Sequence, residues 1–306
     1  MSLDPQIAPL IEALDAGFPP VQTMTGAQAR ATITSRFVPP REPEPVAEVR
    51  DATVPGPVGD IPIRIYRPAH DGRLPILVYA HGGGFVFCDL DSHDGLCRDI
   101  TNRIPALVVS VAYRLAPEHQ WPAAAEDVYA VTQWAADNAE DIGGDARSVV
   151  VGGDSAGGNL AAVTALMARD RGDPPVAAQL LLYPVIAADF DNESYRLFGK
   201  GFYNPKPAMR WYWDQYVPAA KDREHPYASP LRADLTGLPP AVVVIAGHDP
   251  LRDEGIAFAD ALGAAGVTTA RCVFEGGIHG FMTMPTLGIA QQARQRTCRE
   301  LSRLLG

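Results

Sequence analysis

The chain has 306 residues, of which 47% are hydrophobic and 20% are charged. This balance is typical of an ordered globular enzyme and excludes low-complexity and fibrous chains. The 26 basic and 36 acidic residues give a net charge of −10, and the basic residues are scattered, so no nucleic-acid partner is expected.

The first 20 residues contain acidic residues and prolines but no basic start and no unbroken apolar stretch, so a secretory signal is not expected. No apolar run approaches the roughly 20 residues that a membrane-spanning helix needs, so integral membrane association is not expected. A cytoplasmic location is the default expectation. The four cysteines lack a C-x-x-C spacing and are interpreted as reduced, structural thiols.

The chain begins with helical patterns over residues 1–48, which end in the proline-rich connector "VPPREPEP". Two strand-like segments follow, "EVRDATV" (48–54) and "IPIRIYR" (61–67), on either side of the turn-rich "PGPVGD". This arrangement predicts an antiparallel hairpin that leads into the main domain.

The rest of the chain alternates apolar runs of strand length with helical patterns, and most of the runs are too continuous to have a solvated face. Strands are predicted at 74–80, 106–113, 148–154, 176–184, 241–249 and 268–276. Helices are predicted at 94–104, 122–140, 156–171, 252–265 and 286–305, the last with its arginines (Arg294, Arg296, Arg299, Arg303) on a solvated face. The pattern predicts an α/β fold with a mainly parallel sheet covered on both faces.

The connection over residues 187–228 is unusually long and rich in aromatic side chains, which is typical of a functional insertion. Together with residues 1–48 it is interpreted as a cap over the carboxyl edge of the sheet. The alternative is that its rings only pack the insertion onto the core. The predicted division is therefore a cap of residues 1–48 and 187–228, and a core of residues 49–186 and 229–306.

A G-x-S-x-G motif follows the strand at 148–154 and precedes a helix: Gly153, Asp154, Ser155, Ala156 and Gly157. This is the position of a nucleophile elbow, in which a strained turn presents the serine and the two glycines avoid crossing backbone. A glycine-rich turn with an idle serine is the structural alternative. No phosphate-binding glycine motif is present in the sequence.

A second motif, "HGGGF", directly follows the strand at 74–80. Its successive glycines allow backbone N–H groups to face a cleft and to hold a developing oxyanion. Gly83 and Gly84 are the predicted donors, joined by the N–H of Ala156 at the positive end of the next helix. His81 and Gly82 are expected to support this loop rather than to react.

A base and an acid are predicted after the last two strands. His279 lies in "EGGIHGF" and Asp249 in "GHDPLRDEG", so both should reach the sheet edge that carries Ser155. Asp253 and Glu254 compete for the acid's role, and His248, His93 and His119 for the base's. No helix-spaced pair of histidines suggests a metal site, and no cofactor is expected.

These motifs resemble the hormone-sensitive-lipase branch of the α/β-hydrolases. The matching stretches are "HGGGF" (81–85), "YRLAPEHQWPAAAEDV" (113–128), "GDSAGGNLAA" (153–162), "DPLRDEG" (249–255) and "HGF" (279–281). The resemblance implies an eight-stranded, mostly parallel sheet, a helical cap and serine esterase activity on short acyl chains.

The predicted function is hydrolysis of short- to medium-chain carboxylic esters through a Ser-His-Asp triad and an acyl-enzyme intermediate. Because an ordinary histidine titrates near ~6.5, activity should fall as the pH drops through that region. Two alternatives stay open: an amidase or deacetylase of the same fold, and a catalytically silent ligand-binding protein. The expected partner is a small ester, and a homodimer formed through a sheet edge is compatible with the sequence.

Overall fold

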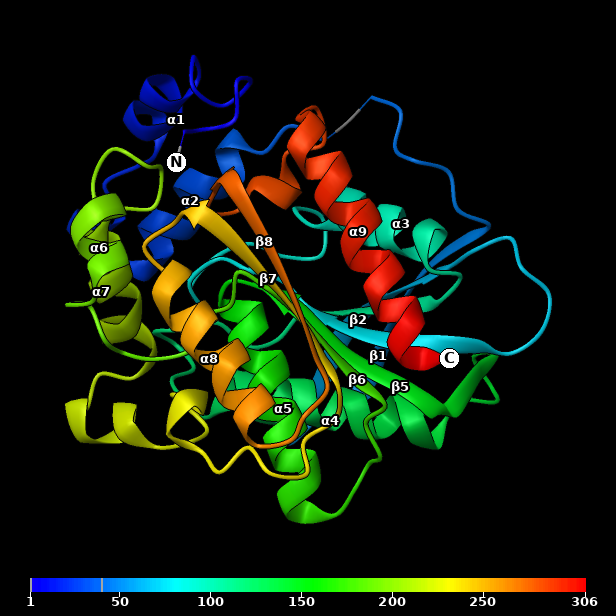
Figure 1. Ribbon diagram of the computed structural model, residues 1–306. Coiled ribbons are helices and arrows are strands. Elements are labelled where there is room, and N and C mark those ends of the chain that lie inside the picture. The colour runs from blue at the N-terminus through cyan, green and yellow to red at the C-terminus, as the bar shows by residue number, and fades with distance from the viewer. Residues whose placement is uncertain (1, 40) are drawn as a thin grey trace.

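The computed structural model describes residues 2–39 and 41–306 and contains one eight-stranded sheet (Figure 1). The strands lie in the order β1-β2-β4-β3-β5-β6-β7-β8. Their bounds are β1 Glu48–Pro55, β2 Asp60–Arg67, β3 Leu74–Ala80, β4 Leu107–Val111, β5 Gly144–Asp154, β6 Ala178–Leu182, β7 Ala241–His248 and β8 Thr269–Ile278.

The helices alternate with the parallel strands or lie in the two segments outside this alternation. Their bounds are α1 Ile11–Gly17, α2 Gly26–Arg36, α3 Asp94–Arg103, α4 Ala123–Asp137, α5 Ala156–Arg171, α6 Glu193–Phe198, α7 Lys206–Tyr216, α8 Arg252–Ala264 and α9 Gly288–Leu305. The predicted α/β fold is confirmed. The predicted hairpin is confirmed as well, because β1 pairs antiparallel with β2. The remaining strands of the sheet, from β4 to β8 in the order given above, pair parallel with one another.

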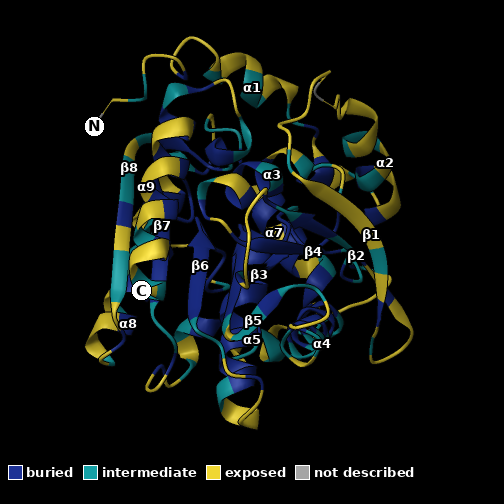
Figure 2. Cartoon of the chain, turned by 90° about the vertical axis from the view of Figure 1, so that its right-hand side faces the viewer, coloured by how far each residue is buried: buried dark blue, intermediate teal, exposed yellow. Residues whose placement is uncertain are grey.

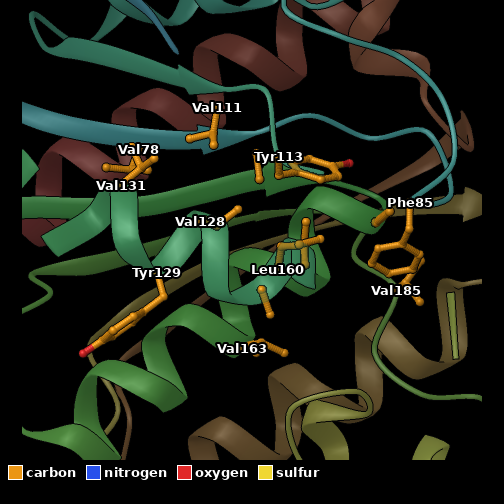
Figure 3. Packing of buried hydrophobic residues seen from close by; sticks show 14 of the residues in the cluster. Val78, Phe85, Val111, Tyr113, Val128, Tyr129, Val131, Leu160, Val163 and Val185 are labelled. Carbon is orange, nitrogen blue, oxygen red and sulfur yellow. The ribbon is translucent and has the colours of Figure 1, made fainter. Parts of the chain in front are cut away.

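The central strands are buried on both faces (Figure 2). Successive side chains of a strand point to opposite faces, so β3 contributes Ile76 and Val78 to one hydrophobic cluster and Leu77 and Tyr79 to another. The first cluster includes apolar side chains of α4 and α5, several of which Figure 3 shows around Val78. The second includes side chains of α3 and α9. This two-sided covering explains why the strands have continuous apolar sequences.

Local backbone chemistry sets where two elements end. The strand expected at 176–184 is shorter, Ala178–Leu182, because Tyr183 adopts a positive φ of 35° and the chain leaves the sheet there. Helix α5 spans the predicted residues 156–171 and ends at Gly172, whose left-handed conformation (φ 76°) closes the last turn.

The N-terminal segment and the long connection gather at one end of the sheet, where α1, α2, α6 and α7 lie together (Figure 1). The side chain of Asn159 on α5 joins the two ends of the connection, because its amide donates to the carbonyls of Val185 (3.0 Å) and Ala228 (2.9 Å). These carbonyls lie at the borders of the predicted insertion, 187–228. The division into cap and core stays a prediction.

Within residues 2–39 and 41–306, no helix is both long enough and apolar enough to cross a membrane. The cytoplasmic location and the homodimer stay predictions.

Candidate active site

Ser155 lies in a strained turn between β5 and α5. Its φ of 55° and ψ of −118° are unfavourable for a residue with a side chain, and the turn is held by bonds from Ser155 N to Leu182 O (2.9 Å) and from Val185 N to Ser155 O (3.0 Å). A Cβ atom at Gly157 would lie 1.9 Å from the carbonyl oxygen of Ala80, so only glycine fits beneath the turn. The sequence around Ser155 thus produces the sharp strand-to-helix turn of a nucleophile elbow.

The structure brings Ser155, His279 and Asp249 together in one hydrogen-bonded line. His279 Nε2 lies 2.9 Å from Ser155 Oγ, and His279 Nδ1 lies 2.7 Å from Asp249 Oδ2. Asp249 is fully buried, and its Oδ1 accepts the N–H of Leu251 at 2.9 Å, which fixes the carboxylate. In the tautomer that carries its proton on Nδ1, His279 donates to Asp249 and leaves Nε2 unprotonated toward Ser155 Oγ.

The competing acids and bases bind other groups or, in the case of His119, lie at the surface. Asp253 accepts the N–H of Ser194 (2.7 Å), and Glu254 accepts the N–H of Ile186 (2.7 Å). Burial raises the pKa of Glu254 well above its usual range. His248 Nδ1 contacts Glu275 O at 2.8 Å, and His119 is exposed.

The two glycines after Gly82 have backbone conformations that a side chain would strain. Gly83 has φ 117° and Gly84 has φ 59°, and a Cβ at Gly84 would lie 2.4 Å from the Tyr212 ring. Among the hydrogen bonds of the described residues, none has the backbone N–H of Gly83, Gly84 or Ala156 as donor to a protein group. Among the described residues these three N–H groups therefore lack a protein acceptor, and Gly83 and Gly84 line the pocket at Ser155.

His81 is buried and braces the same loop. Its ring stacks on Tyr113 with centroids 4.4 Å apart, and Nδ1 lies 2.7 Å from Gly82 O. The Tyr113 hydroxyl donates to His81 O at 2.7 Å. Burial and then the neighbouring charge of His93 lower the pKa of His81 to about 4, so the imidazole is neutral at pH 7.

A pocket of about 390 Å³ leads to Ser155 and His279, and both segments outside the alternating strands and helices line it. The lining contains several apolar and aromatic groups and a single arginine at the outer end of α2, Arg36. The N-terminal segment contributes Gly17, Phe18, Pro19, Ile33, Arg36 and Phe37, and the connection 187–228 contributes Tyr203, Asn204, Met209, Tyr212 and Trp213.

The interpretation of the last helix's arginines as a solvated face is wrong for Arg294. This residue is 3% exposed, and its guanidinium donates to Met282 O from Nε (2.9 Å) and lies 3.5 Å from Asp99. Helical periodicity indicates the burial of Arg294, because this residue lies four positions after buried Ala290 and three before buried Thr297, on the same face of α9. The sequence indicates no supporting role for Asp154 or His93, although both are buried at the pocket.

Comparisons with known proteins identify the family of the chain. A sequence profile described as the alpha/beta hydrolase fold matches residues 77–283. The carboxylic ester hydrolase LipN of Mycobacterium tuberculosis is 45% identical over 80% of this chain and 67% of its own length. The carboxylesterase NlhH of the same organism is 39% identical over 98% of this chain and 96% of its own.

Among solved structures, a thermostable esterase from Pseudomonas putida ECU1011 has a TM-score of 0.94 and 37% identity, with 100% of this chain and 98% of that chain covered. The fold and the site thus define an α/β-hydrolase. The chain belongs to the hormone-sensitive-lipase-like esterases of this fold, and its class is that of the carboxylic ester hydrolases.

Proposed function

We propose that the protein hydrolyses short- to medium-chain carboxylic esters, with Ser155 as nucleophile, His279 as base and Asp249 as the orienting acid. The observation that carries the proposal is the position of His279, which lies 2.9 Å from Ser155 Oγ and 2.7 Å from Asp249 Oδ2 at once. Both distances are within the range that proton transfer requires.

In the first step, His279 Nε2 takes the proton of Ser155 as Oγ attacks the ester carbonyl carbon. The carbonyl oxygen becomes an oxyanion, which the N–H groups of Gly83, Gly84 and Ala156 hold. The protonated His279 then gives its proton to the departing alcohol, and the acyl group remains on Oγ. The ion pair with Asp249 stabilises the imidazolium during this step.

In the second step, water takes the place of the alcohol. His279 removes a proton from the water as its oxygen attacks the acyl carbon, the same three N–H groups hold the second oxyanion, and the proton returns to Ser155 Oγ as the acid leaves. Both steps use one base and one anion site, which is why a single imidazole is sufficient.

The pocket supports the substrate class. Its volume of about 390 Å³ lies near the lower end of the range for ligand sites, and apolar rings from the N-terminal segment and the connection 187–228 face it. We further propose that these two segments form a cap, which selects small esters with apolar acyl groups over long fatty acyl esters.

The test is turnover of p-nitrophenyl butyrate by wild type and four variants. Ser155→Ala and His279→Ala should each lower kcat by about 10⁶, and Asp249→Asn by about 10⁴, because these groups act as a unit. Ser110→Ala is the matched control, because this buried serine of β4 lies outside the pocket. Turnover by Ser155→Ala within tenfold of the wild type would contradict the assignment.

Acyl length is tested with a series of p-nitrophenyl esters from acetate to oleate and with the anilide of the best acid. We expect butyrate to be cleaved faster than oleate, and the ester faster than the anilide. Preferential cleavage of oleate would contradict the proposed acyl length, and preferential cleavage of the anilide would favour the amidase.

A further inference from the structure

We propose that Asp154, the residue before Ser155, is a positioning residue that holds the oxyanion loop against the nucleophile. The oxyanion loop is defined as residues 82–93, which begin with the three glycines. The inference rests on the proposed function, because it assumes that Gly83 and Gly84 bind the oxyanion.

Asp154 contacts both ends of the oxyanion loop. Its Oδ1 accepts the N–H of Gly82 at 2.9 Å, directly before the proposed donors. The imidazole of His93, at the far end, has Nε2 3.1 Å from Oδ1 and 3.3 Å from Oδ2. The hydroxyl of Tyr79 donates to Oδ1 at 2.8 Å from β3. One carboxylate thus joins the first residue of the loop to the last.

The contact is tight and charged. Asp154 is 4% exposed, and a Cβ at Gly82 would lie 2.4 Å from its Oδ2. Burial alone would raise the pKa of Asp154, but the charge and hydrogen bond of His93, with the bonds from Tyr79 and Gly82, lower the pKa below its usual range. The carboxylate is therefore ionised, and charge-assisted bonds to it are shorter and stronger than neutral ones.

Because Asp154 and Ser155 are adjacent, the same strained turn fixes both side chains. A shift of Asp154 would move Gly82 and hence the N–H groups of Gly83 and Gly84 relative to Ser155 Oγ. Oxyanion stabilisation depends on donors preset at about 3 Å from the developing charge, so loss of this contact should act on the transition state more than on substrate binding.

Ser92, His93 and Asp154 also form a hydrogen-bonded line, since Ser92 Oγ lies 3.1 Å from His93 Nδ1. This line is not a second nucleophilic triad. Ser92 Oγ already donates to Asp89 O (2.8 Å) and accepts the N–H of Asp89 (2.9 Å), so the hydroxyl is held in a local turn. The line instead ties that turn to Asp154.

The experiment compares wild type with Asp154→Asn, which keeps the shape but removes the charge. Three quantities are measured: kcat and KM for p-nitrophenyl butyrate, the inhibition constant of an alkyl trifluoromethyl ketone, and that of the unfluorinated ketone. Ser155 Oγ adds to the carbonyl carbon of the fluorinated ketone, and the carbonyl oxygen becomes a hemiketal oxyanion. The affinity of this ketone therefore reports on the anion site. In Asp154→Asn we expect kcat and the affinity for the fluorinated ketone to fall together by about 100-fold. KM and the affinity for the unfluorinated ketone should stay within threefold of the wild-type values.

Asp127→Asn is the matched control, because Asp127 is equally buried (1% exposed) but binds Arg114 outside the oxyanion loop. It should lower the melting temperature and leave kcat and the fluorinated-ketone affinity within threefold. His93→Phe keeps a ring but removes the nitrogen that contacts Asp154, and it should lower both quantities about tenfold, which tests the inference even if Asp154→Asn fails to fold.

The inference is overturned if Asp154→Asn or His93→Phe folds and retains both kcat and the affinity for the fluorinated ketone. Failure of the proposed function looks different. In that case the wild type itself would not cleave the ester or would not bind the fluorinated ketone more tightly than the unfluorinated one.

Discussion

The guanidinium of Arg294 donates from Nε to the carbonyl oxygen of Met282 at 2.9 Å, three residues beyond His279. Helix α9 thereby holds the short turn Phe281–Thr283 that follows the proposed base. The charge of Arg294 is balanced by Asp99 of α3 at 3.5 Å, and Asp99 also binds Arg103 at 2.7 Å. A buried ion pair between α9 and α3 thus supports the loop of His279.

Replacing Arg294 by methionine should reduce both stability and turnover. Breaking a buried ion pair costs about 3 kcal/mol, and the freed turn lets the His279 loop move, so kcat should fall by roughly tenfold. The measurements are urea unfolding and p-nitrophenyl butyrate turnover. Arg299→Met on the exposed face of α9 is the control and should change stability by less than about 0.5 kcal/mol. Equal effects of the two changes would refute the anchoring role.

His81 should make stability depend on pH. Its native pKa of about 4 is below the ordinary value of 6.5, so the unfolded chain binds the proton first as the pH falls. This contribution is complete above pH 6.5 and is lost as the pH falls from 6.5 to about 4, a total of about 3 kcal/mol from the difference in pKa.

The measurement is urea unfolding from pH 7 to pH 4 for wild type and His81→Asn. The variant should lose less stability over this interval than the wild type, because its side chain binds no proton. His70→Asn, on the surface, is the control and should retain the wild-type slope. A slope for His81→Asn as steep as that of the wild type would disprove this prediction.

Two helical glycines should respond in opposite directions to alanine. At Gly157 the added Cβ would lie 1.9 Å from Ala80 O, so Gly157→Ala must displace backbone and should cost more than about 3 kcal/mol. At Gly263 on α8 nothing lies within 4 Å of the added atom, and alanine should stabilise the helix by roughly 0.5 kcal/mol. Thermal unfolding of the two variants measures both effects, and a Gly157→Ala protein as stable as the wild type would show that the turn tolerates a Cβ at this position.

The positions of the three proposed catalytic side chains followed from the order of strands. Each follows a parallel strand, and such strands share one carboxyl edge, so Ser155, Asp249 and His279 were expected at the same place although 30 and 124 residues separate the histidine from its partners. Their roles stay proposals. Alternation of apolar runs and helices likewise predicted the sheet, because strands buried on both faces need helices on both sides.

The supporting residues were not predictable in the same way. Asp154 meets Gly82 and His93 over separations of 72 and 61 residues, and no local pattern encodes such a pairing. The burial of Arg294 is not predictable from the residue type, because an arginine on a helix usually faces solvent. Its contacts with Asp99 and Met282 O compensate for the loss of hydration. Sequence patterns identify reactive side chains by position, whereas their supports depend on contacts between distant elements.

The most direct measurement of the central claim is the site of covalent labelling by a p-nitrophenyl alkylphosphonate, which loses p-nitrophenol and leaves its phosphorus on the attacking oxygen. Peptide mass spectrometry of the wild type should place one adduct on Ser155, with release of one equivalent of p-nitrophenol, and His279→Ala should be labelled at least about 100-fold more slowly. An adduct on Ser92, or undiminished labelling of Ser155→Ala, would contradict the account.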